Sequence, residues 1–102
     1  MNNSLSAEFE LRDGEIYTIG REGDIRLDSP TVSKQHVAIK IKNERIYLCD
    51  LNSTNGTYVE VNDKLFVFVE GYVGPLQTVV IGDVRCTLRG LLEDWALSRL
   101  SA

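Results

Sequence analysis

The stretch from which the fold can be read is Asp50-Leu51-Asn52-Ser53-Thr54-Asn55-Gly56-Thr57. Asn55-Gly56 is the strongest turn signal in the sequence, because asparagine and glycine both tolerate positive φ. The runs at residues 45–49 and 58–61 have the alternating pattern of strands. The simplest interpretation is a polar hairpin loop with no other role. However, five hydrogen-bonding side chains in the six positions from 52 to 57 are more than a turn needs.

Size and composition indicate one soluble globular domain. The chain has 102 residues, of which 43% are hydrophobic and 25% charged. No apolar run approaches the roughly 20 residues of a membrane span, so we expect no membrane partner. Residues 1–5 lack the basic and apolar regions of a secretory signal, and we expect a cytoplasmic location. We also expect a monomeric domain, and the sequence leaves open whether it is part of a larger protein.

Charge and metal-binding residue types exclude several classes of function. The net charge is −4, so the chain lacks the basic surface of a nucleic-acid binder, and any anion site must be local. Cys49 and Cys86 fall within predicted strands, where reduced, buried thiols are the expected state. One histidine and two cysteines without ligand spacing do not make a zinc site. We therefore expect no metal and no cofactor.

Alternating apolar residues predict an all-β protein. The clearest strand is residues 36–41, with Val37, Ile39 and Ile41 on one face. Nine or more short strands separated by turn signals are typical of a β-sandwich. We expect a loop at 71–75 and strands at the following residues: 6–11, 15–19, 25–27, 36–41, 45–49, 58–61, 65–69, 78–81 and 84–88.

The pattern changes to helical spacing only at the end of the chain. Apolar residues between 91 and 100 predict a short helix that begins just after Gly90. One interpretation is that this helix covers one end of the β core. The other is that it serves as a handle for a second molecule or for the rest of a longer protein.

Three loops carry side chains that suit an anion. The loops at 20–24, 29–35 and 52–56 supply Arg21, Ser33, Lys34, Thr54 and Asn55. Arginine binds phosphate oxygens through two parallel hydrogen bonds, and lysine adds a mobile charge. The hydroxyls can donate to the remaining oxygens. This set suits a phosphate dianion better than it suits catalysis.

These loops resemble a known family. Ile19-Gly20-Arg21, Ser33-Lys34-Gln35-His36 and residues 50–57 are similar, in order and spacing, to the motifs of forkhead-associated (FHA) domains. The resemblance covers about residues 8–89. It implies an eleven-stranded FHA/SMAD-like β-sandwich that binds phosphothreonine-containing proteins or peptides in kinase-linked signalling. The expected organisation is a disordered segment at 1–5, the FHA domain at 6–90, and a helix or the start of a linker at 91–102.

The resemblance also implies a role for each phosphate-binding residue. Arg21 would grip the phosphate and Ser33 would donate its hydroxyl to it. Lys34 stands where the family often has arginine or asparagine, and would add a cationic contact. Thr54 would contact the phosphate through its hydroxyl or its backbone.

The remaining implied residues bind the peptide or support the loops. Asn55 would hydrogen-bond the backbone of the bound peptide and hold it extended. Gly20, His36 and Gly56 would be structural, with the imidazole bracing the loops from inside. Asn52 departs from the family pattern, which usually has glycine there, but asparagine tolerates positive φ best after glycine. A second departure, at residues 77–79, puts the register of residues 70–80 in doubt.

Less specific interpretations stay open. Arg21 could be an exposed charge paired with a neighbouring acid, Lys34 a solvated lysine, and Asn55 only a turn residue. A phosphate-independent interaction or scaffold domain of the same fold is the alternative function. An enzyme is not expected, although Ser33, His36 and Asp50 include the residue types of a hydrolase triad. They lack a nucleophile elbow.

Overall fold

The period-two alternation of apolar residues builds the centre of the molecule. In the computed structural model, which describes residues 11–100, strand β3 (Val37–Lys42) buries Val37, Ile39 and Ile41 as predicted. This strand pairs with a neighbour on either side in a mixed sheet. The order of strands in this first sheet is β2 (Ile25–Arg26), β1 (Ile16–Gly20), β3, β4 (Arg45–Asp50) and β7 (Glu70–Val73).

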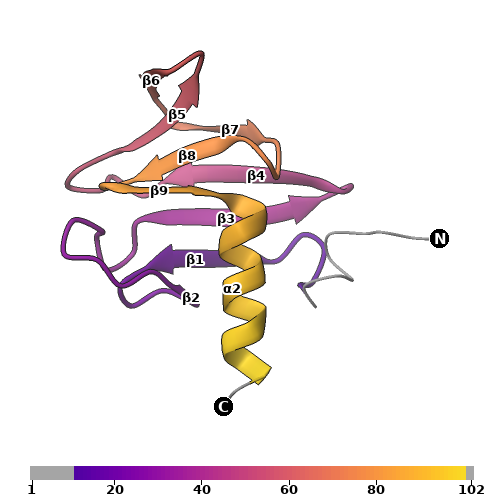
Figure 1. Ribbon diagram of the computed structural model, residues 1–102. Helices are drawn as coiled ribbons and strands as arrows, with labels where there is room; N and C mark the ends of the chain where they lie inside the picture. Colours follow the sequence, from indigo (N-terminus) through magenta and orange to yellow (C-terminus); the bar gives the residue numbers. More distant parts are fainter. Residues whose placement is uncertain (1–10, 101–102) are drawn as a thin grey trace.

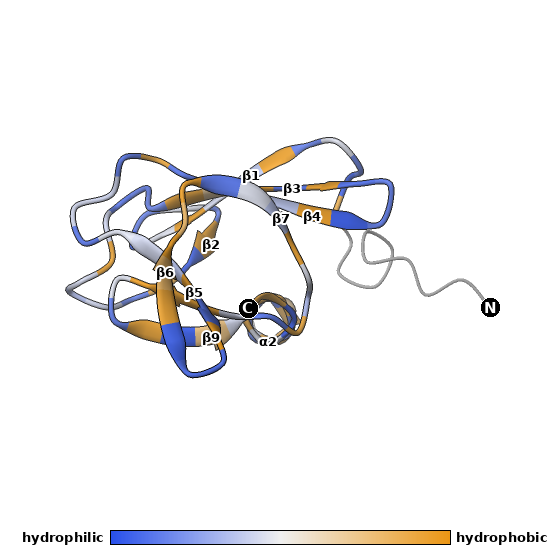
Figure 2. Ribbon diagram, turned by 90° about the horizontal axis from the view of Figure 1, so that it is seen from above, coloured by the Kyte–Doolittle hydropathy of each residue, from blue (hydrophilic) through white to orange (hydrophobic). Residues whose placement is uncertain are grey.

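A second, antiparallel sheet completes a β-sandwich, as expected. Its strands lie in the order β6 (Lys64–Val67), β5 (Thr57–Val61), β8 (Thr78–Ile81) and β9 (Val84–Thr87). Figure 1 shows how the sheets are arranged, and Figure 2 shows them from above as two layers. Large aliphatic side chains from both sheets form the core, including Ile19, Ile39, Leu48, Val79 and Ile81.

The number of strands differs from the family-based expectation. Residues 11–100 form nine strands rather than eleven. Between β2 and β3 the described chain forms no strand. Its loop is held instead by isolated backbone hydrogen bonds and by side-chain hydrogen bonds. The strand predicted at 6–11 lies outside the described residues except for Leu11, which is buried in the core.

Two turns between neighbouring strands close hairpins with backbone geometry that favours asparagine. Asn43 and Glu44 join β3 to β4 with φ of 52° and 65°, and Asn62 and Asp63 join β5 to β6 with the same values. Two consecutive residues at positive φ match the right-handed twist of the strands. The segment at 50–57 is different. It connects β4 in one sheet to β5 in the other, so the simple hairpin interpretation is wrong.

Strand β7 was not predicted, and the expected loop at 71–75 is wrong in its first half. Glycines at 71 and 74 and a proline at 75 suggested a loop. The backbone nevertheless pairs with β4, with Tyr72 opposite Tyr47 and Val73 opposite Ile46. Glycine weakens a strand but does not prevent pairing, because it keeps its backbone N–H and C=O groups.

The C-terminal helix α2 (Leu88–Leu100) begins three residues before the predicted start at 91. Thr87 ends β9, and its hydroxyl accepts the backbone N–H of Gly90 at 3.1 Å, which is the geometry of a helix N-cap. Leu88, Leu91 and Leu92 are buried in the core. The helix lies end-on beside β9 in Figure 2, so it covers one side of the sandwich, as the first of the two interpretations required.

The two cysteines lie in strands as predicted but are only partly buried. Cys49 is in β4 and Cys86 in β9, and both are free thiols. Burial raises the pKa of the Cys86 thiol to about 11, so it stays protonated at neutral pH. No helix within residues 11–100 is both long enough and apolar enough to cross a membrane.

Candidate anion-binding site

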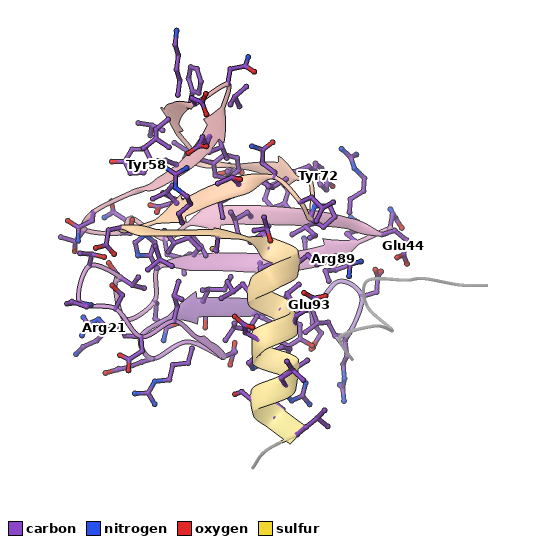
Figure 3. All side chains as sticks on the ribbon, viewed as in Figure 1. Arg21, Glu44, Tyr58, Tyr72, Arg89 and Glu93 are labelled. Carbon is purple, nitrogen blue, oxygen red and sulfur yellow. The ribbon has the colours of Figure 1, made fainter. Side chains whose placement is uncertain are left out.

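The three loops that the sequence singled out lie at one edge of the sandwich. Strand β1 ends at this edge, β3 starts there, and β4 ends there (Figure 1). Figure 3 places Arg21 at this edge and Glu44, in the β3–β4 turn, at the opposite one. The antiparallel register of β1, β3 and β4 therefore brings together residues that are more than thirty positions apart in the chain.

Gly20 lets two of these loops approach each other. A Cβ atom at this position would lie 2.2 Å from the backbone oxygen of Lys34, so no other residue fits without moving the backbone. The loops are then joined by backbone hydrogen bonds. The N–H of Arg21 donates to the carbonyl of Ser33 at 3.1 Å, and that of Glu22 donates to the carbonyl of Lys34 at 3.0 Å.

The half-buried guanidinium of Arg21 is held by one of its five N–H groups. Its Nε donates to the carbonyl oxygen of Val32 at 2.6 Å. Within residues 11–100 the two terminal nitrogens have no hydrogen-bond partner and no carboxylate at ion-pair distance. The four remaining donors are therefore available to an anion. The surface ion pair considered for Arg21 is not formed.

Lys34 lies at the same edge but is less fixed. Its backbone is part of the contact with Gly20, whereas its side chain is exposed. Among the described residues its ammonium group makes no ion pair. This geometry fits a solvated lysine, and it equally leaves the ammonium group accessible to a ligand at this edge.

Ser33 connects its loop to the segment at 52–56. Its Oγ accepts the backbone N–H of Thr54 at 3.1 Å. The hydroxyl proton of Ser33 then has no acceptor in the described part of the chain, and the hydroxyl of Thr54 likewise has no partner there. Both hydroxyls can donate to a ligand.

His36 lies beneath these loops and is fully buried. Its Nδ1 accepts the backbone N–H of Ser33 at 3.0 Å, so the proton of the neutral ring must be on Nε2, which donates to the carbonyl of Gly56 at 2.9 Å. Both ring nitrogens are used by backbone groups, and neither bonds to the Ser33 hydroxyl. The triad considered above is therefore not assembled.

Asp50 organises the loop at 52–56, a role that the sequence interpretation missed. Its carboxylate accepts the backbone N–H and the hydroxyl of Ser53, at 3.0 and 2.6 Å, and the hydroxyl of Thr57 at 2.7 Å. Burial alone would raise the pKa of Asp50, but the hydrogen bonds from Ser53 and Thr57 outweigh it, and the pKa lies below its ordinary value. An aspartate three positions before a serine is a known local motif and could have shown this role.

Backbone conformation in the same loop explains two of its residues. Asn52 has φ of 56° and Gly56 has φ of 85°. Asparagine thus occupies a left-handed position, as the departure from the family pattern suggested. Asn55, by contrast, does not have positive φ, so its own backbone conformation does not require an asparagine.

Asn55 is oriented by the neighbouring loop. Its Nδ2 donates to the backbone oxygen of Thr31 at 2.8 Å. Its amide oxygen accepts no hydrogen bond from any described residue. The exposed side chain is therefore fixed on its amino side and free on its acceptor side, which suits it to accept an N–H from a ligand.

The structure thus brings all eight predicted residues together at one edge through side-chain or backbone contacts. The side chain of Lys34 and the hydroxyl of Thr54 have no partner among residues 11–100. The sequence interpretation missed Asp50 as the centre of one loop. It also missed the support of a second loop by Thr31, whose hydroxyl donates to the carboxylate of Asp83 at 2.6 Å. Within residues 11–100, no three histidine, cysteine, aspartate or glutamate side chains gather into a metal-binding group.

Comparison with known proteins gives a consistent result. A family model for the FHA domain matches residues 17–67. The glycogen accumulation regulator GarA of Mycobacterium tuberculosis is 41% identical over 51 residues, covering 48% of this chain and 32% of that protein. This chain therefore spans about a third of the length of the curated relatives it matches.

Solved structures extend the similarity over most of the fold. One comes from a structural and functional study of phosphothreonine-dependent FHA domain interactions, with a TM-score of 0.63 and 32% identity over 76% of this chain and 77% of that one. Another is the FHA domain of FhaA, crystallised in complex with the intracellular domain of Rv3910. It has a TM-score of 0.61 and 32% identity over 74% of this chain and 79% of the other.

Proposed function

This chain belongs to the FHA domain family, and from that premise we propose that it binds a protein or peptide containing phosphothreonine. FHA domains are binding modules. One related structure was studied for interactions that depend on phosphothreonine. The ligand would sit at the edge formed by the loops at 20–24, 29–35 and 52–56.

The proposed phosphate site uses hydrogen-bond donors that the fold positions but for which the described residues supply no acceptor. The terminal nitrogens of Arg21 would bind two phosphate oxygens, and the hydroxyl of Ser33 would donate to one of them. The hydroxyl of Thr54 would make a further contact, because its backbone N–H is already bonded to Ser33. Lys34 would contribute charge from its exposed position.

A phosphorylated threonine matches this set of donors. It carries a charge of about −1.5 to −2 at neutral pH and offers three strong acceptor oxygens. Asn55 would then bind the backbone of the peptide through its free amide oxygen. The observation that carries the proposal is that Arg21 and Ser33, each fixed by a hydrogen bond to a neighbouring loop, keep donors for which the described residues supply no acceptor.

The first test is the substitution Arg21→Ala. A peptide would be selected with the wild-type chain from a phosphothreonine peptide library, and its affinity measured by fluorescence polarisation. Hydrogen bonds between charged groups contribute about 1.5–3 kcal/mol each, so loss of two of them should weaken binding at least about 100-fold. The circular dichroism spectrum should not change.

Arg12→Ala is the matched control. It removes the same charge from an exposed residue that precedes β1, whereas Arg21 follows the opposite end of that strand. Its affinity should equal that of the wild type within about twofold. If Arg21→Ala binds as tightly as Arg12→Ala, the assignment of Arg21 is wrong. Equal binding of phosphorylated and unphosphorylated peptide would favour a phosphate-independent interaction domain instead.

The setting of this binding reaction is also a proposal. We propose a role in signalling linked to serine/threonine kinases, with a protein as the partner rather than nucleic acid or membrane. The net charge of −4 supports a local anion site over a broad basic surface. We propose that the domain acts as a monomer in the cytoplasm.

A further inference from the structure

We infer that Asp83, in the turn between β8 and β9, is a positioning residue that fixes both the phosphate-binding and the peptide-binding side chains. The inference rests on the proposed function, because its effect is on the affinity of that site. Asp83 itself is not placed against the ligand. It acts through Thr31 in the loop between β2 and β3, which lies 52 positions away in the chain.

Asp83 and Thr31 are joined by two reciprocal hydrogen bonds. The hydroxyl of Thr31 donates to Oδ1 of Asp83 at 2.6 Å and accepts the backbone N–H of Asp83 at 3.0 Å. The hydroxyl of Ser29 donates to the same carboxylate oxygen at 3.2 Å. One carboxylate of the second sheet therefore holds two hydroxyls of a loop that leads into the first sheet.

Close packing reinforces this contact. Gly82 has φ of 63°, and a Cβ atom on it would lie 2.6 Å from the backbone oxygen of Thr31. The loop thus rests directly on the turn, with no side chain between them. Because the contact is short and directional, a change at residue 83 should move the backbone at residue 31.

The backbone of this loop supplies the acceptors that orient the site. The carbonyl of Thr31 receives Nδ2 of Asn55 at 2.8 Å. The carbonyl of the next residue, Val32, receives Nε of Arg21 at 2.6 Å. Two adjacent carbonyls thereby set the direction of one side chain for the peptide and one for the phosphate. Displacement of Thr31 would misdirect both at once.

A pair of substitutions at residue 83 separates this role from a general effect on folding. Asp83→Ala removes both side-chain acceptor contacts, whereas Asp83→Asn keeps an acceptor oxygen of the same shape. We expect Asp83→Ala to weaken binding of the selected phosphothreonine peptide about tenfold or more, and Asp83→Asn to weaken it less than about threefold. Thr31→Val and Thr31→Ser form the corresponding pair on the loop, with the same expected contrast.

A double-mutant cycle and NMR give readouts that a loss of stability would not produce. If the two residues act through one contact, Asp83→Ala combined with Thr31→Val should bind no more weakly than the worse single variant. The side-chain amide signals of Asn55 and the Nε–H signal of Arg21 should shift in Asp83→Ala and stay in place in Asp83→Asn. These spectra are recorded on the free chain, without peptide.

Each result either supports or overturns the inference. Affinity within twofold of wild type for Asp83→Ala, or fully additive losses in the cycle, would overturn it. If Asp83→Ala fails to fold, Thr31→Val decides by the same criteria. If the wild-type chain binds no phosphothreonine peptide, the proposed function fails by itself. In that case, shifted Asn55 and Arg21 signals in Asp83→Ala still support the positioning role, and unshifted signals reject it.

Discussion

At the scale of single residues, the site depends on side chains that are fixed by the backbone of another loop. Arg21 is held by the carbonyl of Val32, Asn55 by that of Thr31, and Ser33 by the N–H of Thr54. Each therefore loses little conformational freedom on binding a ligand, because its rotamer is already set. The donors that remain are the ones a ligand could use.

Asp50 provides a pH-dependent test at this scale. Because its folded-state pKa lies below the ordinary value of about 3.9, its stabilising contribution is complete above that value and is lost as the pH falls through the folded-state pKa. Asp50→Asn should lower the free energy of unfolding by about 1–3 kcal/mol at pH 7. The difference in the free energy of unfolding between Asp50→Asn and wild type should become smaller below about pH 4. Urea titrations at several pH values measure both effects.

Asp28→Asn is the control for this prediction. Asp28 is exposed and has no hydrogen-bond partner among residues 11–100, so its substitution should change the free energy of unfolding by less than about 0.5 kcal/mol. A gap between Asp50→Asn and wild type that is constant from pH 7 to the acid limit would show that the carboxylate charge is not what stabilises the loop.

Residue types in the loops could be predicted, but their long-range partners could not. Arginine, serine and asparagine between strands indicate hydrogen bonding to an anion from their chemistry alone. The pairing of Thr31 with Asp83 depends on two sheets meeting at one edge, which no local pattern encodes. The left-handed conformation of Asn52 was predictable because it follows from one residue's own preferences.

At the scale of elements, strands with buried, alternating residues could be predicted from the sequence, whereas the edge strand β7 and the start of helix α2 could not. Strand β3 follows its pattern closely, because one face is buried. Strand β7 contains Gly71 and is formed by pairing to β4, so its existence is a tertiary effect. The helix start was missed because Gly90 was interpreted as a boundary, whereas Thr87 is the cap.

The helix α2 makes its own prediction. Leu92 is 1% exposed and packs in the core, so Leu92→Ala should lower the free energy of unfolding by about 2–5 kcal/mol. Leu100 is 81% exposed, and Leu100→Ala should change it by less than about 0.5 kcal/mol. Thermal or urea unfolding measures the difference. Equal stability of the two variants would mean that α2 is not part of the folded core.

At the scale of the whole molecule, an acidic chain presents cations at one edge. The net charge is −4, yet Arg21 and Lys34 lack ion-pair partners within the described residues. A negatively charged partner would therefore be repelled at long range and attracted close to the site. Salt screens both the repulsion and the attraction. We expect the attraction to the exposed lysine to have the larger effect on affinity, because it acts at short range.

Salt dependence tests this balance. Raising the salt concentration from about 50 mM to about 500 mM should weaken binding of the selected phosphothreonine peptide about threefold to tenfold. Lys34→Gln should reduce that dependence, because an exposed charge is screened more than the half-buried Arg21. Isothermal titration calorimetry at several salt concentrations gives the slope of affinity against salt concentration for the wild type and for Lys34→Gln. Identical slopes for Lys34→Gln and wild type would leave Lys34 as a solvated lysine without a role.

The path of the chain from β4 to β5 has a consequence for how ligand and fold depend on each other. This stretch passes from one layer of the sandwich to the other, and it carries Thr54 and Asn55. A ligand bound both by Arg21, at the end of a strand of the first sheet, and by Asn55, in the segment between the two sheets, would link the sheets to each other. Ligand binding and the association of the two sheets would then depend on the same few hydrogen bonds, so the domain would resist unfolding most strongly when the ligand is bound.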